Sequence, residues 1–277
     1  METGENNTII NFHDKSFISD LSEEYHLSIQ ISNSSFTYCI LNIKKFHYCL
    51  LKSFKIESKF SEISKIISKN PELSLKYSTT SIGLVNFPNT LVPKEISETI
   101  DSKEILALND NVLDVILKDN IKACEITNLY SINSDLNETI NNYFPSAKIK
   151  SQSSILIDAF LKNIKKDVSV HIYLKDDFMN IIIINDQSPL FQNKFNFSSK
   201  EDILYYILFT YQQLELSPED VPIYLYGSVT DSCFKIIYDY VRNVKYGNKP
   251  KEFTYIKEIN QLENQEYFAL FSQVLCV

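Results

Sequence analysis

Two adjacent carboxylates and one glycine at the end of an apolar run are the residues in this sequence whose types and spacing could do chemistry. Asp176 and Asp177 lie in a short polar turn between apolar runs, and Gly227 ends the run that begins at Pro222. Carboxylates repel a phosphate unless a metal ion lies between them, whereas a glycine lets the backbone approach a ligand. An ordinary polar hairpin turn also accounts for the two aspartates, and we favour that explanation.

The histidines and cysteines form no recognisable catalytic or metal-binding pattern. Three of the four histidines lie in predicted strands, where a histidine is usually a packing residue. A pair of Cys49 with His47 stays open, because residues two apart in a strand share a face, but that spacing alone activates no nucleophile. The sequence has no Cys-x-x-Cys, no His-x-x-x-His and no Gly-x-Ser-x-Gly. We therefore predict no catalytic residue and no metal site.

Glycine is scarce, with four in 277 residues, at positions 4, 83, 227 and 247. Phosphate loops of the Walker or dinucleotide type need closely spaced glycines, so both types are excluded. Gly227 fits a strand-to-helix turn that needs a positive φ as well as it fits a ligand contact.

The charge balance argues against a nucleic-acid partner. The formal net charge is -8, and Arg242 is the only arginine. Proteins that bind nucleic acids cluster Lys and Arg against the phosphates. A genome rich in A and T would also lower the arginine content, which weakens the second observation. We still predict no nucleic-acid partner.

Cysteine usage and the N-terminal residues predict a cytoplasmic protein. The five cysteines are odd in number and widely spaced, and four lie in apolar runs, as expected of unpaired thiols. Residues 1–14 are polar and lack a basic region followed by an apolar core, so they do not read as a secretory signal. The longest purely apolar run, Ile181–Ile184, is too short to cross a bilayer, and we predict no membrane insertion.

The first half of the chain predicts a strand meander followed by alternating helices and strands. Short β-rich runs separated by polar turns are typical of antiparallel strands, and a change to helical spacing before Asn70-Pro71 marks a helix. The expected elements are strands at 27–31, 36–41 and 46–56, a helix at 59–69, a strand at 79–86, a helical stretch from Pro93, a strand near 123–130, and a further helix.

From Val168 the same order restarts. The helix at 201–216 is amphipathic, with Ser198 or Ser199 as its N-cap, and it carries aromatic residues on more than one face. Part of it is therefore available to contact a partner or the other half. The expected elements are strands at 168–174, 178–185 and 190–197, this helix, a strand at 222–227, a helix at 231–243, a strand at 253–259 and a helix at 265–275.

This restart indicates an internal duplication. Laying Leu27 on Val168 places Leu-Ser-Ile-Gln-Ile over Val-Ser-Val-His-Ile, and the first amphipathic helices of the halves then nearly coincide. We predict a polar N-terminal tail at 1–20, a first subdomain at 21–150, a connecting helix and linker at 151–167, and a second subdomain at 168–277. One continuous mixed sheet without a cleft is the alternative.

Three segments resemble an uncharacterised bacterial family, the domain of unknown function 3822, with a degenerate actin-like ATPase fold. They are Tyr25–Ile31, Thr90–Pro93, and Tyr226-Gly227 with the helix that ends at Tyr240-Val241-Arg242. The duplicated order is also that of the actin, sugar kinase and Hsp70 superfamily, whose members bind ATP between the halves. The resemblance spans nearly the whole chain and implies an α/β protein with a duplicated RNase H-like fold, each subdomain a mixed sheet flanked by helices. It implies no established activity.

The resemblance also implies where a nucleotide would bind. Members of the superfamily hold the phosphates in two hairpins, each with an Asp-x-Gly. Here the first hairpin, Ile31–Phe36, has neither residue, and the second, Leu174–Phe178, keeps Asp176 and Asp177 without a glycine. The strand that contacts adenosine ends in two glycines in the superfamily, and here it reads Leu225-Tyr226-Gly227-Ser228.

We therefore interpret the chain as a non-catalytic protein-interaction or scaffold protein, not an enzyme, without a cofactor. The sequence does not identify its protein partner, and a homodimer is one possibility. The alternative is an ATP-binding assembly factor of the same fold, with Asp176, Gly227, Ser228 and Asp231 at the nucleotide. An RNase H-like nuclease is least favoured, because it needs several carboxylates that converge on metal ions.

Overall fold

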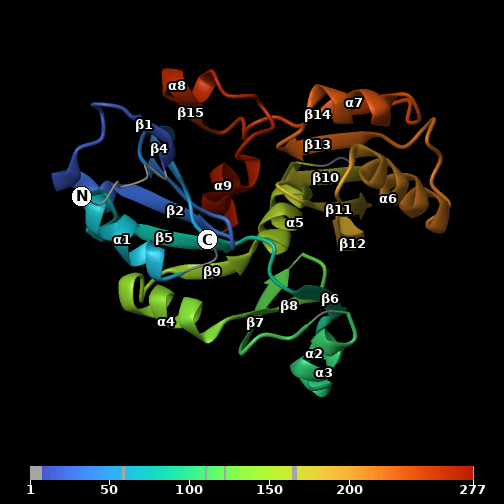
Figure 1. Ribbon diagram of the computed structural model, residues 1–277, viewed down its shortest axis with the longest axis horizontal. Coiled ribbons are helices and arrows are strands. Elements are labelled where there is room, and N and C mark those ends of the chain that lie inside the picture. The colour runs from blue at the N-terminus through green and yellow to red at the C-terminus, as the bar shows by residue number, and fades with distance from the viewer. Residues whose placement is uncertain (1–7, 58–59, 110, 122, 164–166, 277) are drawn as a thin grey trace.

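The first half of the chain forms a mixed sheet built on the predicted meander (Figure 1). β2 (Tyr25–Ile31), β3 (Ser35–Asn42) and β4 (His47–Lys55) are antiparallel. β5 (Thr79–Leu84) joins β2 in parallel, and β9 (Lys148–Ser151) joins β5 in parallel. The computed structural model describes residues 8–57, 60–109, 111–121, 123–163 and 167–276. The strands of this sheet lie in the order β1 (Thr8–His13), β4 (His47–Lys55), β3 (Ser35–Asn42), β2 (Tyr25–Ile31), β5 (Thr79–Leu84) and β9 (Lys148–Ser151).

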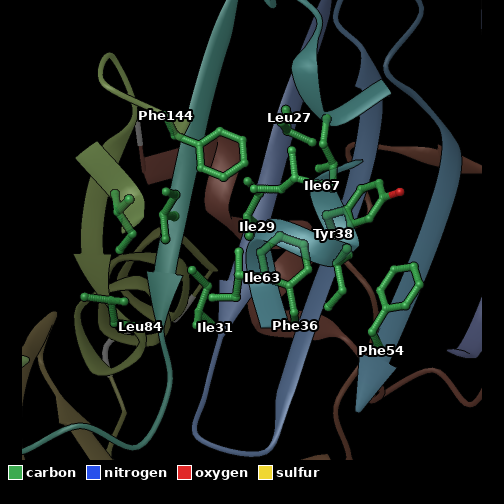
Figure 2. Close-up of a cluster of buried hydrophobic side chains, with 14 of the residues drawn as sticks. Leu27, Ile29, Ile31, Phe36, Tyr38, Phe54, Ile63, Ile67, Leu84 and Phe144 are labelled. Atoms are coloured by element: carbon green, nitrogen blue, oxygen red, sulfur yellow. The ribbon is translucent and has the colours of Figure 1, made fainter. Parts of the chain in front are cut away.

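The alternation in β2 determines which face of this sheet is covered by helices. Leu27, Ile29 and Ile31 point to the same face because successive side chains of a strand alternate. There they meet Ile63 and Ile67 of α1 (Ser61–Lys69), as Figure 2 shows, and α4 (Ser134–Tyr143) packs into the same core. The predicted helix at 59–69 thus covers the meander that precedes it.

A small separate sheet is inserted between β5 and α4. It consists of β6 (Asn89–Pro93), β8 (Ile126–Ile132) and β7 (Val115–Ile121), in that spatial order, with α2 (Lys94–Thr99) and α3 (Ser102–Ala107) beside it. The sequence prediction placed one strand near 123–130 and missed β7 and β9. Both are half-exposed strands that carry lysines, so their hydrophobic pattern is weak.

The second half repeats the order of the first sheet. The order β12-β11-β10-β13-β14 corresponds strand for strand to β4-β3-β2-β5-β9, with β13 and β14 again parallel to their neighbours. This matches the predicted duplication of the topology. The elements are β10 (Ser169–Lys175), β11 (Phe178–Asn185), β12 (Ser188–Asn196), α6 (Lys200–Gln213), β13 (Ile223–Gly227), α7 (Asp231–Tyr238) and β14 (Val244–Tyr246).

The C-terminal segment crosses back to the first sheet. β15 (Thr254–Tyr255) pairs in parallel with the start of β4, and α8 (Lys257–Asn260), α9 (Phe268–Ser272) and a 3-10 turn (Gln273–Cys276) follow. The strand predicted at 253–259 is therefore wrong beyond Tyr255, where a helix begins. Phe253, Ile256 and Phe271 pack with Tyr48 of β4, so this end of the predicted second subdomain is shared between the halves.

The predicted N-terminal tail also needs a correction. Residues 8–13 form β1, which pairs with β4, and a 3-10 turn spans Ser19–Glu24. Exposed and half-buried side chains alternate along β1, with Thr8, Ile10 and Phe12 half-buried. The polar residues among them obscured this pattern in the sequence. Residues 1–7 of that tail and 164–166 of the predicted linker lie outside the described part of the chain. The proposed division at 150 to 167 stays a prediction.

α5 (Gln152–Asn163) lies between the two sheets, where the sequence predicted a connecting helix (Figure 1). Leu156 and Phe160 are buried against the second sheet, and the helix also contacts α9. α6 and α7 pack together on the opposite face of that sheet. Within the residues that the structure describes, no helix is long and apolar enough to span a membrane.

The capping box of α6 allows a test of this local structure. Ser199 Oγ accepts a hydrogen bond from Asp202 N at 3.1 Å, and the Asp202 carboxylate accepts one from Ser199 N at 3.0 Å. We expect Ser199→Ala to lower the free energy of unfolding by about 1 kcal/mol, measured by chemical denaturation. Ser68→Ala, an exposed serine inside α1, is the matched control and should be neutral or slightly stabilising. Equal effects of the two substitutions would contradict the capping role.

Candidate functional site

A cavity of about 300 Å³ lies where the two hairpins meet. The β2–β3 and β10–β11 turns approach each other from the two sheets. The end of β13, the segment before α9, Ile9 of β1, and Ser53 and Lys55 of β4 also line the cavity. Its position matches the one predicted for a nucleotide. The lining residues used below are Ser34, Ser35, Lys175, Asp176, Gly227, Ser228, Glu266 and Tyr267.

Direct side-chain contacts join the two hairpins at this cavity. Ser34 Oγ donates a hydrogen bond to Asp176 Oδ2 at 2.8 Å. Lys175 Nζ donates one to Ser35 Oγ at 2.9 Å. We call these two hydrogen bonds the hairpin clamp. The Asp176 carboxylate, which the ATP-binding alternative places at the nucleotide, therefore accepts a serine hydroxyl in this structure.

The first hairpin turn is held together by its own serines. Ser32 Oγ accepts hydrogen bonds from Ser34 N at 3.1 Å and from Ser35 N at 2.9 Å. A serine hydroxyl that binds nearby backbone N–H groups stabilises a turn without a glycine. The same arrangement uses the N–H groups that a phosphate-binding hairpin would direct at its ligand.

Gly227 has a structural reason to be glycine. Its φ is +79°, and a Cβ at this position would lie 2.1 Å from Leu174 O. Gly227 N donates to Gln265 O at 3.0 Å, and Ser228 N donates to Leu174 O at 2.8 Å. The end of β13 is thus tied to the end of β10 and to the segment before α9. Both N–H groups are used inside the protein.

Burial shifts the pKa of two groups at the cavity. It lowers the pKa of the Lys175 ammonium, an effect that the nearby Asp176 opposes. It raises the pKa of Glu266, and the neighbouring Glu263 raises it further. Both shifts run toward the neutral forms of these groups, because burial disfavours a charge.

The structure brings three of the four predicted nucleotide residues together. Asp176, Gly227 and Ser228 line the cavity, whereas Asp231 is the exposed first residue of α7 and is not part of the lining. Glu266 and Tyr267 were missed, because only the return of the C-terminal segment places them there. The serine-rich turn at 32–35 was the one local signal that could have identified Ser34 and Ser35.

The candidate nucleophile pair does not form. Cys49 is buried in the first core, where its thiol donates to Ile40 O and burial raises its pKa to about 12. His47 instead contacts Thr254 Oγ1 at 2.8 Å. Among the described residues, no group of three or more His, Cys, Asp or Glu side chains could hold a metal ion.

Solved structures show the same fold as this chain. A Bacteroides thetaiotaomicron protein described as having an actin-like ATPase fold and unknown function matches with a TM-score of 0.77 and 21% identity, over 83% of this chain and 93% of that one. The type IV pilus PilM–PilN complex matches with a TM-score of 0.60 and 12% identity, over 91% and 98%. The ethanolamine utilization protein EutJ of Carboxydothermus hydrogenoformans matches at 0.51 and 6%, over 91% and 89%.

These similarities establish an actin-like ATPase fold and no activity, because all three identities are low. No match was found among curated protein sequences. A family model matches residues 14–244, which is most of the chain. The chain therefore belongs to the family described as protein of unknown function (DUF3822).

Proposed function

We propose that this protein is a non-catalytic protein-interaction or scaffold component that keeps the actin-like fold without using it as an ATPase. One observation carries the proposal. The N–H groups of Ser34, Ser35, Gly227 and Ser228 surround the cavity, and each already donates a hydrogen bond inside the protein. A nucleotide site of this type needs such groups free to bind phosphate oxygens.

The cost of breaking these internal hydrogen bonds would substantially weaken phosphate binding. A net internal hydrogen bond contributes about 1 kcal/mol, so freeing four N–H groups would cost about 4 kcal/mol relative to a loop in which they are free. About 1.4 kcal/mol corresponds to a tenfold change in affinity, which makes this a loss of nearly a thousandfold. The hairpin clamp adds two more contacts that a phosphate would have to displace.

An exposed aromatic surface on α6 supports binding to another protein. The side chains of Tyr205 and Phe209 are 60% and 43% exposed, and their rings stack 5.9 Å apart. Tyr238 and Tyr240, in and after α7, are also exposed. Tyrosine and phenylalanine are enriched in protein interfaces, so the exposed Tyr205–Phe209 pair is suited to a contact with another protein. The fold neighbour PilM was solved in complex with PilN, so this fold accommodates a protein partner.

The second candidate is an ATP-binding assembly factor of the same fold. The observation in its favour is the cavity itself, since Asp176, Gly227 and Ser228 line it together. For this function the hairpin clamp would have to open and the turn serines would have to release their N–H groups. Asp231 would have no direct role in it.

Thermal unfolding with and without millimolar ATP and Mg²⁺ separates the two candidates. A ligand at about 100 times its dissociation constant adds roughly 2.7 kcal/mol to the native state. For a chain of this length that raises the midpoint by several degrees, at about 2 to 4 °C per kcal/mol. We expect no Mg²⁺-dependent rise and no nucleotide turnover.

A rise in the unfolding midpoint with ATP and Mg²⁺ that disappears in Asp176→Asn but persists in Asp177→Asn would support the assembly factor. It would refute the first proposal. Asp177 is the matched control because it is the adjacent exposed carboxylate in the same turn. Asparagine keeps an oxygen that can accept the Ser34 hydroxyl, so the clamp is retained while the charge is removed.

The aromatic surface can be tested by partner capture. The double substitution Tyr205→Ser and Phe209→Ser should abolish retention of proteins that the unaltered chain captures from its source cells. Tyr143→Ser is the matched control, because Tyr143 on α4 is 45% exposed and lies outside this surface. Each exposed substitution should change stability by less than about 0.5 kcal/mol. Identical retention by the double variant would show that this surface is not the binding site.

A further inference from the structure

A second and larger cavity, of about 530 Å³, opens at the other end of β10 and β13. Its walls include Ser169 and His171 near the start of β10, Tyr224 on β13, and the loop 247–251 that follows β14. It shares no lining residue with the cavity between the hairpins. Its volume is within the range of small-molecule sites, about 300 to 1,000 Å³.

One wall of this cavity is a continuous set of aromatic rings. His171 and Tyr224 are paired on adjacent parallel strands, and their rings stack 5.2 Å apart at 13°. Phe160 of α5 covers the other side of the His171 ring at 4.2 Å, and Phe268 of α9 stacks on Phe160 at 5.5 Å. Tyr224 is half-buried, so part of its surface is open to the cavity. As the half-buried end of this stack, Tyr224 can pack against a planar ring.

The loop 247–251 is fixed close to this wall. A Cβ at Gly247 would lie 2.1 Å from Cε1 of the Tyr226 ring, so the backbone can take this path only with glycine at that position. Gly247 N also donates to Leu225 O at 2.7 Å, which continues the pairing of β13 with β14. The loop therefore presents Lys249 and Lys251 at a defined position beside the aromatic rings.

The charged groups of the cavity favour an anion. Lys249 is 8% exposed, and its Nζ donates to Leu262 O at 2.7 Å. Burial lowers its pKa, while Glu266 and Glu263 nearby oppose that effect. Lys251 is exposed at the same loop, and Asp167 is the one acidic residue of the lining. His171 adds no charge, because burial lowers its pKa to about 3.

We propose that this cavity binds a small planar aromatic molecule that carries one anionic group, with the ring against Tyr224 and the anion beside Lys249 and Lys251. An anion near a buried ammonium compensates part of the cost of burying that charge. The site is independent of the hairpin cavity, so it goes beyond the proposed function and does not rest on it.

Two probes of the same shape test the two features of the ligand. 1-Naphthoate has two fused rings and a carboxylate, and 1-naphthamide has the same rings and no charge. In calorimetric titrations of the full chain we expect saturable 1:1 binding of 1-naphthoate, and binding of 1-naphthamide at least tenfold weaker. Equal affinities would refute the anion site, and no saturable binding of either probe would overturn the proposal.

Paired substitutions then locate the probe. Tyr224→Leu keeps apolar bulk in the strand without the ring, and Lys251→Met removes an exposed charge, so both variants should fold. We expect each to weaken 1-naphthoate binding at least fivefold. Tyr238→Leu and Lys235→Met are matched controls on the exposed face of α7 and should leave the affinity unchanged. Unaltered binding in both cavity variants, or an equal loss in the controls, would place the probe elsewhere and overturn the proposal.

Discussion

The packing of the C-terminal segment against the first sheet is the constraint on which the arrangement of the two halves depends. Phe271 is fully buried beside Tyr48, whose hydroxyl donates to the Phe271 carbonyl at 2.6 Å. Gln273 Nε2 donates to Ile29 O at 3.1 Å in the centre of β2. Gly83 leaves the space that Gln273 occupies, since a Cβ there would lie 2.8 Å from its Oε1. Phe268 of the same segment packs on Tyr226 of β13, so the end of the chain contacts both sheets and holds their orientation.

That orientation places the hairpin turns in direct contact and thereby sets the chemistry of the cavity between them. Here Ser32 satisfies the first turn, and Leu174 O and Gln265 O satisfy Gly227 and Ser228. Buried and half-buried N–H groups need a partner, and these internal acceptors supply it.

The local sequence pattern was enough to predict the strand meander and the first helix of each half. The alternation at Leu27–Ile31 and the cap at Ser199 are properties of a few neighbouring residues, and both appear in the structure as expected. β7 and β9 were missed because half-exposed strands have weak patterns. The pairing of β15 with β4 depends on contacts such as the stacking of Tyr255 on Tyr48, about 200 residues away, at 5.4 Å and 7°. A distant contact of this kind leaves no local signal.

The contrast between local patterns and distant contacts also explains which residues of the candidate sites could be predicted. Asp176 and Gly227 were predicted because a hairpin turn and a strand end can be recognised from adjacent residues, whereas Glu266 and Tyr267 enter through the C-terminal crossing. The aromatic cavity combines five separate segments, so no spacing in the sequence pointed to it. Lining residues of the two cavities are nevertheless adjacent in sequence at two points. Tyr226 precedes Gly227, and Phe268 follows Tyr267. A molecule bound against Tyr226 or Phe268 would therefore contact residues bonded directly to the wall of the hairpin cavity.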